Sequence, residues 1–400
     1  MANCFNAHIR LYGLRLERRE FMEKDEILVV YGDRPAEMAV KLAEAADLAS
    51  LIGDRKKRVG LKPNLVVSRP ASEGATTHPE IAAGLLAYLK KNGFGNIVIL
   101  EGSWVGGSTS QAFSVCGYRA LAKEAGVELI DTQNDRARAC DCKGMKIEVC
   151  ESALAVDFMI NLPVLKGHCQ TLLTCALKNN KGVISDREKR RFHSMGLHKP
   201  IAHLNTVARS DFIVVDGISG DLDFEEGGNP VYGGRMFSAR DPVLCDAWAA
   251  ELMGYGVSEI PYIGMAEKLG VGSVGPARVI ELNKSFDVSS PVQGGIRPQG
   301  KVRALSLNIK EDGACSACYA SLIFALSRLG SGEQKTLGDI CIGQGYRGLK
   351  SAGLNRDSQK SAGKRGSLGV GQCTSGFASF CPGCPPTGAE LLSFLKNLVY

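Results

Sequence analysis

The feature that most constrains this chain is the alternation of short runs rich in β-branched residues with longer amphipathic segments. Such alternation is typical of βα units, in which helices join parallel strands. We therefore predict an α/β fold with a mostly parallel sheet flanked by helices. The predicted strands cover residues 27–31, 58–61, 97–100, 128–131, 158–162, 212–215, 302–309 and 337–342. The predicted helices cover residues 36–52, 79–91, 109–125, 171–178, 242–253, 260–269 and 389–399.

The length of 400 residues exceeds that of a usual single domain, so we predict more than one part. Residues 1–25 are predicted to form an N-terminal extension, and residues 26–300 an α/β core. After the segment PVQGGIRPQG the sequence becomes rich in Gly, Ser and Cys while a βα rhythm continues. Residues 301–400 are therefore predicted to form a C-terminal cysteine-rich α/β segment that carries a metal cluster.

Composition narrows the classes of function. No run approaches eighteen apolar residues, and Arg or Glu interrupts every apolar stretch near the N-terminus, so we expect a cytoplasmic protein without a membrane span or signal peptide. The net charge of +6 is modest, and interleaved acids give no reason to expect nucleic-acid binding. Basic residues are concentrated at 186–191 and 349–366. The segment 349–366 fits a solvated loop, and it also fits a basic lip over an acidic ligand or partner.

Polar side chains follow several predicted strands, where ligands bind in parallel α/β sheets. Lysines beside glycine-rich turns suit an anionic ligand, because ammonium groups and backbone N–H groups act together. The segment VGGSTS at residues 105–110 is the best phosphate-loop candidate. The candidate catalytic residues are Lys62, Lys166 and His168. The candidate ligand-binding residues are Asn64, His78, Glu101, Ser103, Lys178 and Asp216. His168 could act as a general acid or base, or could bond a strand-end carbonyl.

Fourteen cysteines in a long chain without an export signal indicate reduced thiols and metal ligation rather than disulfides. Cys315 and Cys318 form a C-x-x-C pair, and Cys373, Cys381 and Cys384 follow within the stretch QCTSGFASFCPGC. A thiolate-bound iron or zinc site needs about four thiolates from separate turns. We predict Cys315, Cys318, Cys373 and Cys384 as the ligands, with Cys381 as the alternative. This spacing does not distinguish iron–sulfur from zinc.

Three weaker metal candidates have simpler explanations. Cys140, Cys142 and Cys150 fit a polar β ribbon, and the spacing of five between His193, His198 and His203 matches no single helical face. Asp221 and Asp223 fit a solvated turn, whereas Asp241 fits a helix N-cap before Pro242. The other cysteines in apolar surroundings are predicted to pack in the core, namely Cys116, Cys169, Cys175, Cys245 and Cys341.

An ordered series of motifs resembles the DUF362 family over roughly residues 58–395. These motifs are LKPNLV, GATTHPEI, EGS, NLPVLKGHCQTLLTCALKNNKG, IVVDGISG, SARDPVLCDAWAAELMG and the terminal GQC and GCPP. The resemblance implies an α/β core and a cysteine-ligated cluster, a 4Fe-4S cluster, at Cys315, Cys318, Cys373 and Cys384. Where relatives commonly have K-T-H, this chain has Lys166-Gly167-His168.

We therefore expect a cytoplasmic iron–sulfur protein that moves single electrons. It would act as a carrier between redox partner proteins, or as a reductase of an anionic small molecule held in the α/β crevice. The alternative is a non-redox enzyme or binding protein with a structural zinc or iron–sulfur site. A third interpretation is an interaction module that docks an acidic redox partner through the basic segment 349–366. The sequence gives no indication for or against a flavin, and none about the oligomeric state.

Overall fold

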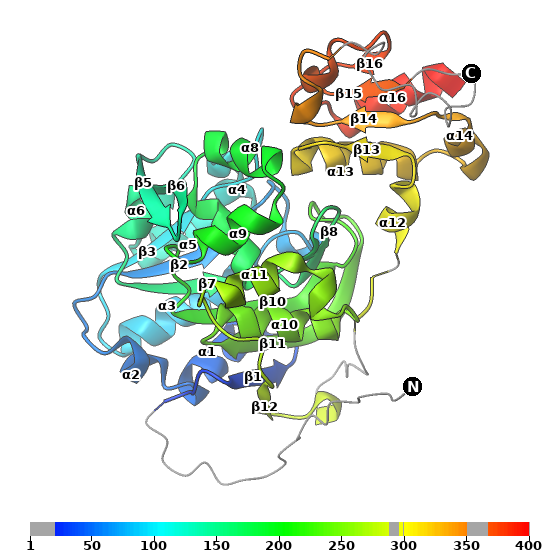
Figure 1. The fold of residues 1–400 in the computed structure, drawn as a ribbon. Helices are drawn as coiled ribbons and strands as arrows, with labels where there is room; N and C mark the ends of the chain where they lie inside the picture. The colour runs from blue at the N-terminus through cyan, green and yellow to red at the C-terminus, as the bar shows by residue number, and fades with distance from the viewer. Residues whose placement is uncertain (1–20, 288–295, 299, 350–366, 400) are drawn as a thin grey trace. The chain divides into compact units, whose positions relative to one another are not determined.

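The computed structural model describes residues 21–287, 296–298, 300–349 and 367–399 (Figure 1). It divides into two compact units. Unit 1 comprises Met1–Ser103, Gly107–Ser185 and His198–Arg297, and unit 2 comprises Trp104–Gly106, Asp186–Leu197 and Pro298–Tyr400. Most of the predicted N-terminal extension and nearly all of the basic segment 349–366 lie outside the described residues.

Unit 1 is built on an eight-stranded sheet with the order β12-β1-β11-β10-β7-β2-β3-β4. The five neighbours from β10 to β4 are parallel, and β11 is antiparallel to both β1 and β10. The predicted α/β fold with a mostly parallel sheet is confirmed. The strands are β1 (Glu26–Tyr31), β2 (Val59–Pro63), β3 (Ile97–Glu101), β4 (Glu128–Asp131), β7 (Phe158–Leu162), β10 (Phe212–Asp221), β11 (Pro230–Ala239) and β12 (Arg278–Glu281).

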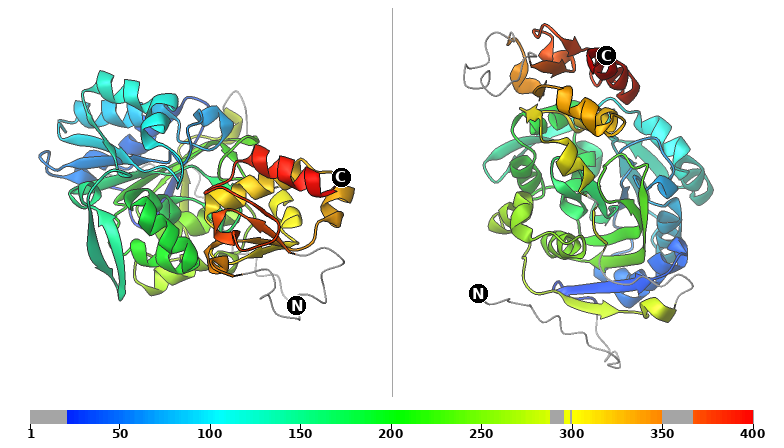
Figure 2. Two further views of the ribbon diagram at one scale, coloured as in Figure 1. Left: turned by 90° about the horizontal axis from the view of Figure 1, so that it is seen from above. Right: turned by 90° about the vertical axis from the view of Figure 1, so that its right-hand side faces the viewer.

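Helices cover both faces of this sheet (Figure 2). Alternate strand residues such as Leu61, Ile99 and Ile160 pack in one core with helices α1 and α3. Their strand neighbours Val98 and Met159 are also buried. Because both faces are covered, the strands are continuous apolar runs rather than alternating ones. The helices of unit 1 are α1 (Pro35–Ala45), α2 (Leu48–Ile52), α3 (Pro79–Lys91), α4 (Thr109–Val115), α5 (Tyr118–Ala125), α6 (Glu151–Leu154), α7 (Ala176–Asn179), α9 (His198–Leu204), α10 (Pro242–Leu252) and α11 (Pro261–Lys268).

Three predicted helices differ from the structure. The helix predicted over 36–52 is broken at Asp47 (φ 46°), and that over 109–125 at Gly117 (φ 81°), because both residues adopt left-handed backbone conformations. The helix predicted over 171–178 is wrong in its first half, where β9 (Leu172–Thr174) pairs with β8 (Lys166–His168). A further hairpin joins β5 (Ala137–Cys142) to β6 (Met145–Cys150), which confirms the β ribbon there.

Unit 2 contains a four-stranded parallel sheet with the order β13-β14-β15-β16. Figure 2 shows α13 and α16 beside each other next to these strands. The strands are β13 (Ile309–Glu311), β14 (Ile340–Ile342), β15 (Leu368–Val370) and β16 (Phe380–Cys381). The helices are α8 (Asp186–Ser194), α12 (Lys301–Leu305), α13 (Ser316–Ser327), α14 (Ser331–Thr336) and α16 (Gly388–Val399).

The strand predicted over 302–309 is wrong, since helix α12 occupies its first half and only Ile309 lies in β13. Gly300 adopts a left-handed conformation (φ 71°) before the helix, and the Ser306 N–H donates to the Val302 carbonyl at 3.0 Å. Apolar residues at mixed spacings of two and three fit either period, so the pattern did not decide between strand and helix.

Close packing of α1 against α3 at Gly84 generates a first prediction. A Cβ atom at Gly84 would lie 2.4 Å from the Ala36 carbonyl oxygen, so Gly84→Ala should force the helices apart. We expect the free energy of unfolding of unit 1 to fall by about 1–3 kcal/mol, despite the helix preference of alanine. The measurement is urea unfolding followed by the fluorescence of Trp248, which packs edge-on against Phe237, in a Trp104→Phe background.

The matched control is Gly264→Ala in α11, where a Cβ atom would meet open space. This variant should gain up to about 1 kcal/mol, as alanine does in an unhindered helix. If Gly84→Ala and Gly264→Ala changed the free energy of unfolding equally, this result would contradict the close approach of α1 and α3.

Candidate functional site

Three of the four strand ends in unit 2 lead into a cysteine. Cys315 is the fourth residue after β13, Cys373 is the third after β15, and Cys384 is the third after β16. Cys318 follows one turn later in α13. Because parallel strands end at the same edge of a sheet, this topology brings thiols from distant parts of the sequence together.

The four thiols line one cavity. Cys315, Cys318, Cys373 and Cys384 all contribute to its wall, and the cavity contains about 450 Å³ of empty space that includes an opening to solvent. Cys381 does not line this cavity, is 3% exposed, and has its sulfur 3.8 Å from the Pro382 carbonyl. The structure therefore groups the four predicted ligands and leaves the predicted alternative outside the group.

The start of helix α13 gives this cavity a positive electrostatic contribution. Cys315 occupies the N-cap position of this twelve-residue helix, and Cys318 lies in its first turn. Unpaired N–H groups at a helix N-terminus favour anions, including thiolates. Burial, together with the neighbouring thiols of Cys315, Cys384 and Cys373, raises the pKa of Cys318. A cation bound in the cavity would favour ionisation of these thiols.

Two glycines allow these strand-end turns. Gly371 (φ 81°) precedes Cys373, and a Cβ atom there would lie 3.6 Å from the Cys318 sulfur. Gly343 (φ 127°) follows β14, and a Cβ atom there would lie 2.0 Å from the Asp312 carbonyl oxygen. Other residues rarely adopt such backbone angles, so glycine is required at both positions.

The spacing of the four thiols exceeds that of a zinc site. In the described part of the chain, three or more donor atoms lie within 4.8 Å of one another only at Cys175, Cys245 and Asp246. No three of the four cavity thiols are therefore that close. Thiolates around a tetrahedral zinc ion are about 3.8 Å apart, given a Zn–S distance of about 2.3 Å.

The buried group of Cys175, Cys245 and Asp246 lies in unit 1 and has a structural explanation. The Asp246 carboxylate accepts hydrogen bonds from the N–H groups of Ala176 (2.7 Å) and Leu177 (3.2 Å), which begin helix α7. Burial raises the pKa of Asp246 to about 7. Both cysteines are fully buried, as their predicted packing role requires.

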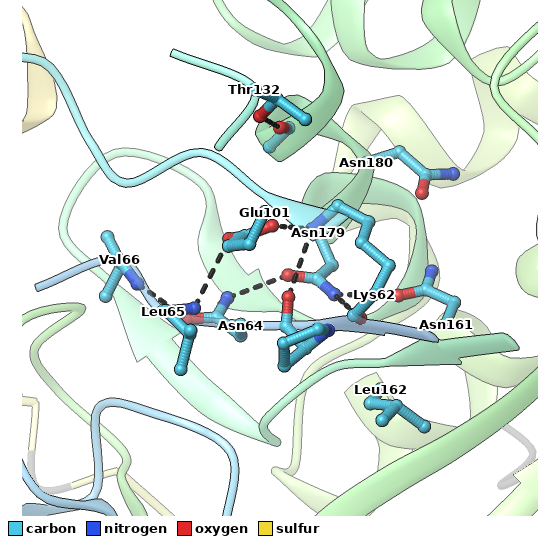
Figure 3. A network of polar contacts seen from close by, with 12 residues as sticks. Lys62, Asn64, Leu65, Val66, Glu101, Thr132, Asn161, Leu162, Asn179 and Asn180 are labelled. Atoms are coloured by element: carbon cyan, nitrogen blue, oxygen red, sulfur yellow. Dashed lines mark hydrogen bonds and ion pairs between the residues drawn. The ribbon is translucent and has the colours of Figure 1, made fainter. Parts of the chain in front are cut away.

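A second polar assembly follows the carboxyl ends of the strands in unit 1 (Figure 3). Lys62 in β2 forms a buried ion pair with Glu101 at the end of β3. Asn64 donates to the Asn179 side chain at 3.0 Å, and Asn179 donates to the Asn161 side chain at 2.7 Å. These contacts join β2, β3 and β7 to helix α7 through side chains that water does not reach.

Lys166, His168 and Lys178 extend this network around Glu225. The Lys166 ammonium donates to the Asn64 side chain (3.1 Å) and to the carbonyls of Ala75 (2.5 Å) and Glu225 (2.9 Å). Burial lowers the pKa of Lys166 to about 7, although the Glu225 carboxylate opposes this shift. Lys178 forms an ion pair with the same carboxylate. Burial alone would raise the pKa of Glu225, but His168 and Lys178 outweigh it and hold that pKa well below its usual range.

The contacts of His168 fix its tautomer. Its Nδ1 atom accepts hydrogen bonds from the N–H groups of Gln170 (3.0 Å) and Thr171 (3.1 Å), and its Nε2 atom lies 2.9 Å from the Glu225 carboxylate. The proton of the neutral ring is therefore on Nε2. Burial lowers the pKa of His168 to about 4, against the opposing effect of Glu225.

The remaining predicted residues of this assembly also have protein partners. His78 contacts the Asp216 carboxylate at 2.7 Å through Nδ1, and the Ser103 hydroxyl donates to the Leu65 carbonyl at 2.7 Å. The structure thus brings the predicted residues together as a buried network. Lys62 and Lys166 are fully buried, and His168 is 3% exposed.

Glu225 is central to this network and was not among the residues predicted from the sequence. It lies in the acidic run SGDLDFEE, where Asp221 and Asp223 were predicted to form a solvated turn. The turn is in fact buried at Asp221, which accepts hydrogen bonds from the N–H groups of Asp223, Phe224 and Asn229. The nearby lysines were the available signal, because buried ammonium groups require acidic partners.

The other candidates do not converge on one site. His198 stacks on Tyr262, and His203 contacts the Cys142 carbonyl at 2.8 Å, whereas His193 lies in unit 2 near the Ser316 hydroxyl. In the VGGSTS segment, the Ser108 side chain caps α4. Asp241 caps α10, as predicted.

The fold and the cysteine cavity together define an α/β protein with a candidate metal-binding unit. Residues 59–251 match the family model described as "Domain of unknown function (DUF362)", so this region of the chain is similar to that family. The matched region ends before the cysteines of the cavity, so the family match concerns only the earlier part of the chain.

A known protein is similar to this chain in sequence, and a solved structure is similar in fold over part of the chain. A thylakoid-associated protein of Synechocystis sp. is 23% identical over 225 residues, which cover 54% of this chain and 68% of that protein. The lactate racemase apoprotein from Thermoanaerobacterium thermosaccharolyticum has 15% sequence identity and a TM-score of 0.39, with 60% of this chain and 59% of that chain covered.

Among the described residues, no helix combines the length and apolar character required to cross a membrane.

The buried state of His168 generates a prediction about acid stability. His168 has a pKa of about 6.5 in the unfolded chain and of about 4 in the folded protein. Between these pH values only the unfolded state binds the proton, so the free energy of unfolding should fall as pH decreases from 6.5 to 4. The full loss attributable to His168 is about 3 kcal/mol. His168→Gln keeps a donor toward Glu225 and should remove this part of the pH dependence, while lowering stability near pH 7.

The measurement is the urea midpoint of the Trp104→Phe protein, with and without His168→Gln, from pH 7 to pH 4. The difference in urea midpoint between the proteins with and without His168→Gln should become smaller as pH decreases. A constant gap would show that His168 is protonated equally in the folded and unfolded states.

Proposed function

We propose that unit 2 binds a 4Fe-4S cluster through Cys315, Cys318, Cys373 and Cys384, and that the protein transfers single electrons. The observation that carries this proposal is the presence of four thiols, from three strand-end turns and the first turn of α13, in the wall of one cavity. Four cysteine thiolates are the usual ligand set of such a cluster, which supplies one-electron redox chemistry when bound.

The spacing of the thiols supports an iron–sulfur cluster over zinc. In a 4Fe-4S cluster each thiolate binds a different iron, so the sulfurs are farther apart than around one ion. The absence of three cavity thiols within 4.8 Å of one another, among the residues that the structure describes, fits this wider arrangement. The N-terminus of α13 and the nearby Arg347 would stabilise the negative charge of the thiolates.

The position of the cavity supports exchange of electrons with a partner protein. Cys384 is exposed, and Cys315, Cys318 and Cys373 are partly exposed. In unit 1, by contrast, Lys62, Lys166 and His168 are already bound by Glu101, Glu225 and backbone carbonyls. An anionic small molecule would have to displace these partners, so we favour an electron carrier over a reductase.

A reducing compartment suits this function, and we propose that the protein acts in the cytoplasm. The described cysteines form no disulfide, and the proposed ligands must remain thiols until the cluster is inserted. The Synechocystis relative is thylakoid-associated by its name. A similar peripheral association of this chain is a hypothesis that cell fractionation would test.

Single cysteine substitutions test the ligand set. Alanine at Cys315, Cys318, Cys373 or Cys384 should reduce the iron content of anaerobically reconstituted protein from about four per chain to less than half, because one iron loses its thiolate. Cys381→Ala is the matched control and should retain the iron, since Cys381 lies outside the cavity wall. The measurement is iron and inorganic sulfide per chain, with unit 1 monitored by Trp248 fluorescence in the Trp104→Phe background.

Loss of iron in Cys381→Ala, together with its retention in Cys384→Ala, would show that Cys381 and not Cys384 is the fourth ligand. Zinc without inorganic sulfide in the wild type would support the alternative of a structural zinc site.

A further inference from the structure

The fourth strand end of unit 2 differs from the other three. β14 is followed by the segment GQGYRG (residues 343–348), which contains no cysteine. At the position that matches Cys373 in the parallel sequence GQC after β15, this segment has Gly345. Gln344 and Arg347 nevertheless line the same cavity as the four thiols.

Both side chains direct N–H groups toward thiol sulfurs. Arg347 Nε donates to the Cys373 sulfur at 3.4 Å, and Gln344 Nε2 lies 3.8 Å from the Cys315 sulfur. Gln344 makes a shorter hydrogen bond, of 2.7 Å, to the Arg190 carbonyl in α8. The Gln344 amide therefore mainly fixes the segment in place, whereas the Arg347 guanidinium brings a full positive charge to a ligand sulfur.

Packing and backbone hydrogen bonds order the turn that carries Arg347. The Tyr346 ring packs edge-on against Phe377 with ring centroids 5.8 Å apart. The N–H group of Arg347 donates to the Gln344 carbonyl at 3.1 Å. Gly345 lies directly against Asp312, where a Cβ atom would lie 2.0 Å from the carboxylate. The exposed Arg347 side chain thus reaches Cys373 from an ordered backbone turn.

We propose that Arg347 is a positioning residue that raises the reduction potential of the cluster by stabilising its reduced state. This inference rests on the proposed function. Reduction adds one electron, and hence one negative charge, to the cluster and its four thiolates. A cation in contact with one thiolate stabilises that extra charge, and an N–H group that donates to the sulfur acts in the same direction.

Substitutions at Arg347 separate charge from hydrogen bonding. Arg347→Met removes both, Arg347→Gln removes the charge, and Arg347→Lys retains it. The control is Arg328→Gln, which removes an equal charge at the C-cap of α13. Arg328 follows Cys315 by thirteen residues along α13, which places it roughly 20 Å away, beyond the Debye length at physiological salt.

The measurement is an EPR-monitored redox titration with dithionite on full-length protein, after iron and sulfide analysis of each variant. At a fixed solution potential, Arg347→Met and Arg347→Gln should lower the ratio of reduced to oxidised cluster by about threefold to tenfold, and tenfold corresponds to about 59 mV. Arg347→Lys should remain near the wild type, and Arg328→Gln should not change the ratio. The difference between Arg347→Gln and the wild type should shrink at high salt.

An unchanged ratio in both Arg347→Met and Arg347→Gln, with full iron content, would overturn the inference while leaving the proposed cluster intact. An equal decrease of the ratio of reduced to oxidised cluster in Arg328→Gln would also overturn the inference. The net charge of the protein, and not the contact of Arg347 with Cys373, would then explain the change. If the wild type contains no iron and sulfide, the proposed function itself fails, and the analysis that precedes the titration reveals this.

Discussion

Both candidate sites depend on one constraint, namely that parallel strands end at the same edge of a sheet. In unit 1 this edge collects Lys62, Glu101 and Asp216 from β2, β3 and β10. In unit 2 the corresponding edge collects cysteines after β13, β15 and β16. Residues as far apart in the sequence as His78 and Asp216, which are separated by 138 positions, therefore become neighbours.

The two sites handle charge differently. In unit 1, each buried ammonium has a carboxylate or carbonyl partner, so removing one partner would leave an uncompensated charge in a dry environment. In unit 2, four thiols line one cavity, with the α13 N-terminus and Arg347 as their positive neighbours. The first arrangement is complete without a ligand, whereas the second favours a positively charged metal centre. This contrast is why we propose a redox function for unit 2.

The sequence predicted what depends on local pattern. The parallel core strands, helix α3 and the Asp241 cap of α10 follow from periodicity and capping residues. The sequence did not predict strand β9 or helix α12, because a few apolar residues at mixed spacing fit two periods. It also missed Glu225, whose partners come from segments about 50 residues away. The four thiols could be selected because each belongs to a recognisable turn, but the donors Gln344 and Arg347 have no such signature.

The central claim is that the cavity thiols hold a redox-active iron–sulfur cluster. The most direct measurement is the EPR spectrum of anaerobically purified wild-type protein before and after dithionite, with iron, sulfide and zinc determined on the same sample. The account predicts about four irons and four sulfides per chain and an EPR signal that appears on reduction. Zinc in place of iron, or a cluster that dithionite does not reduce, would contradict it.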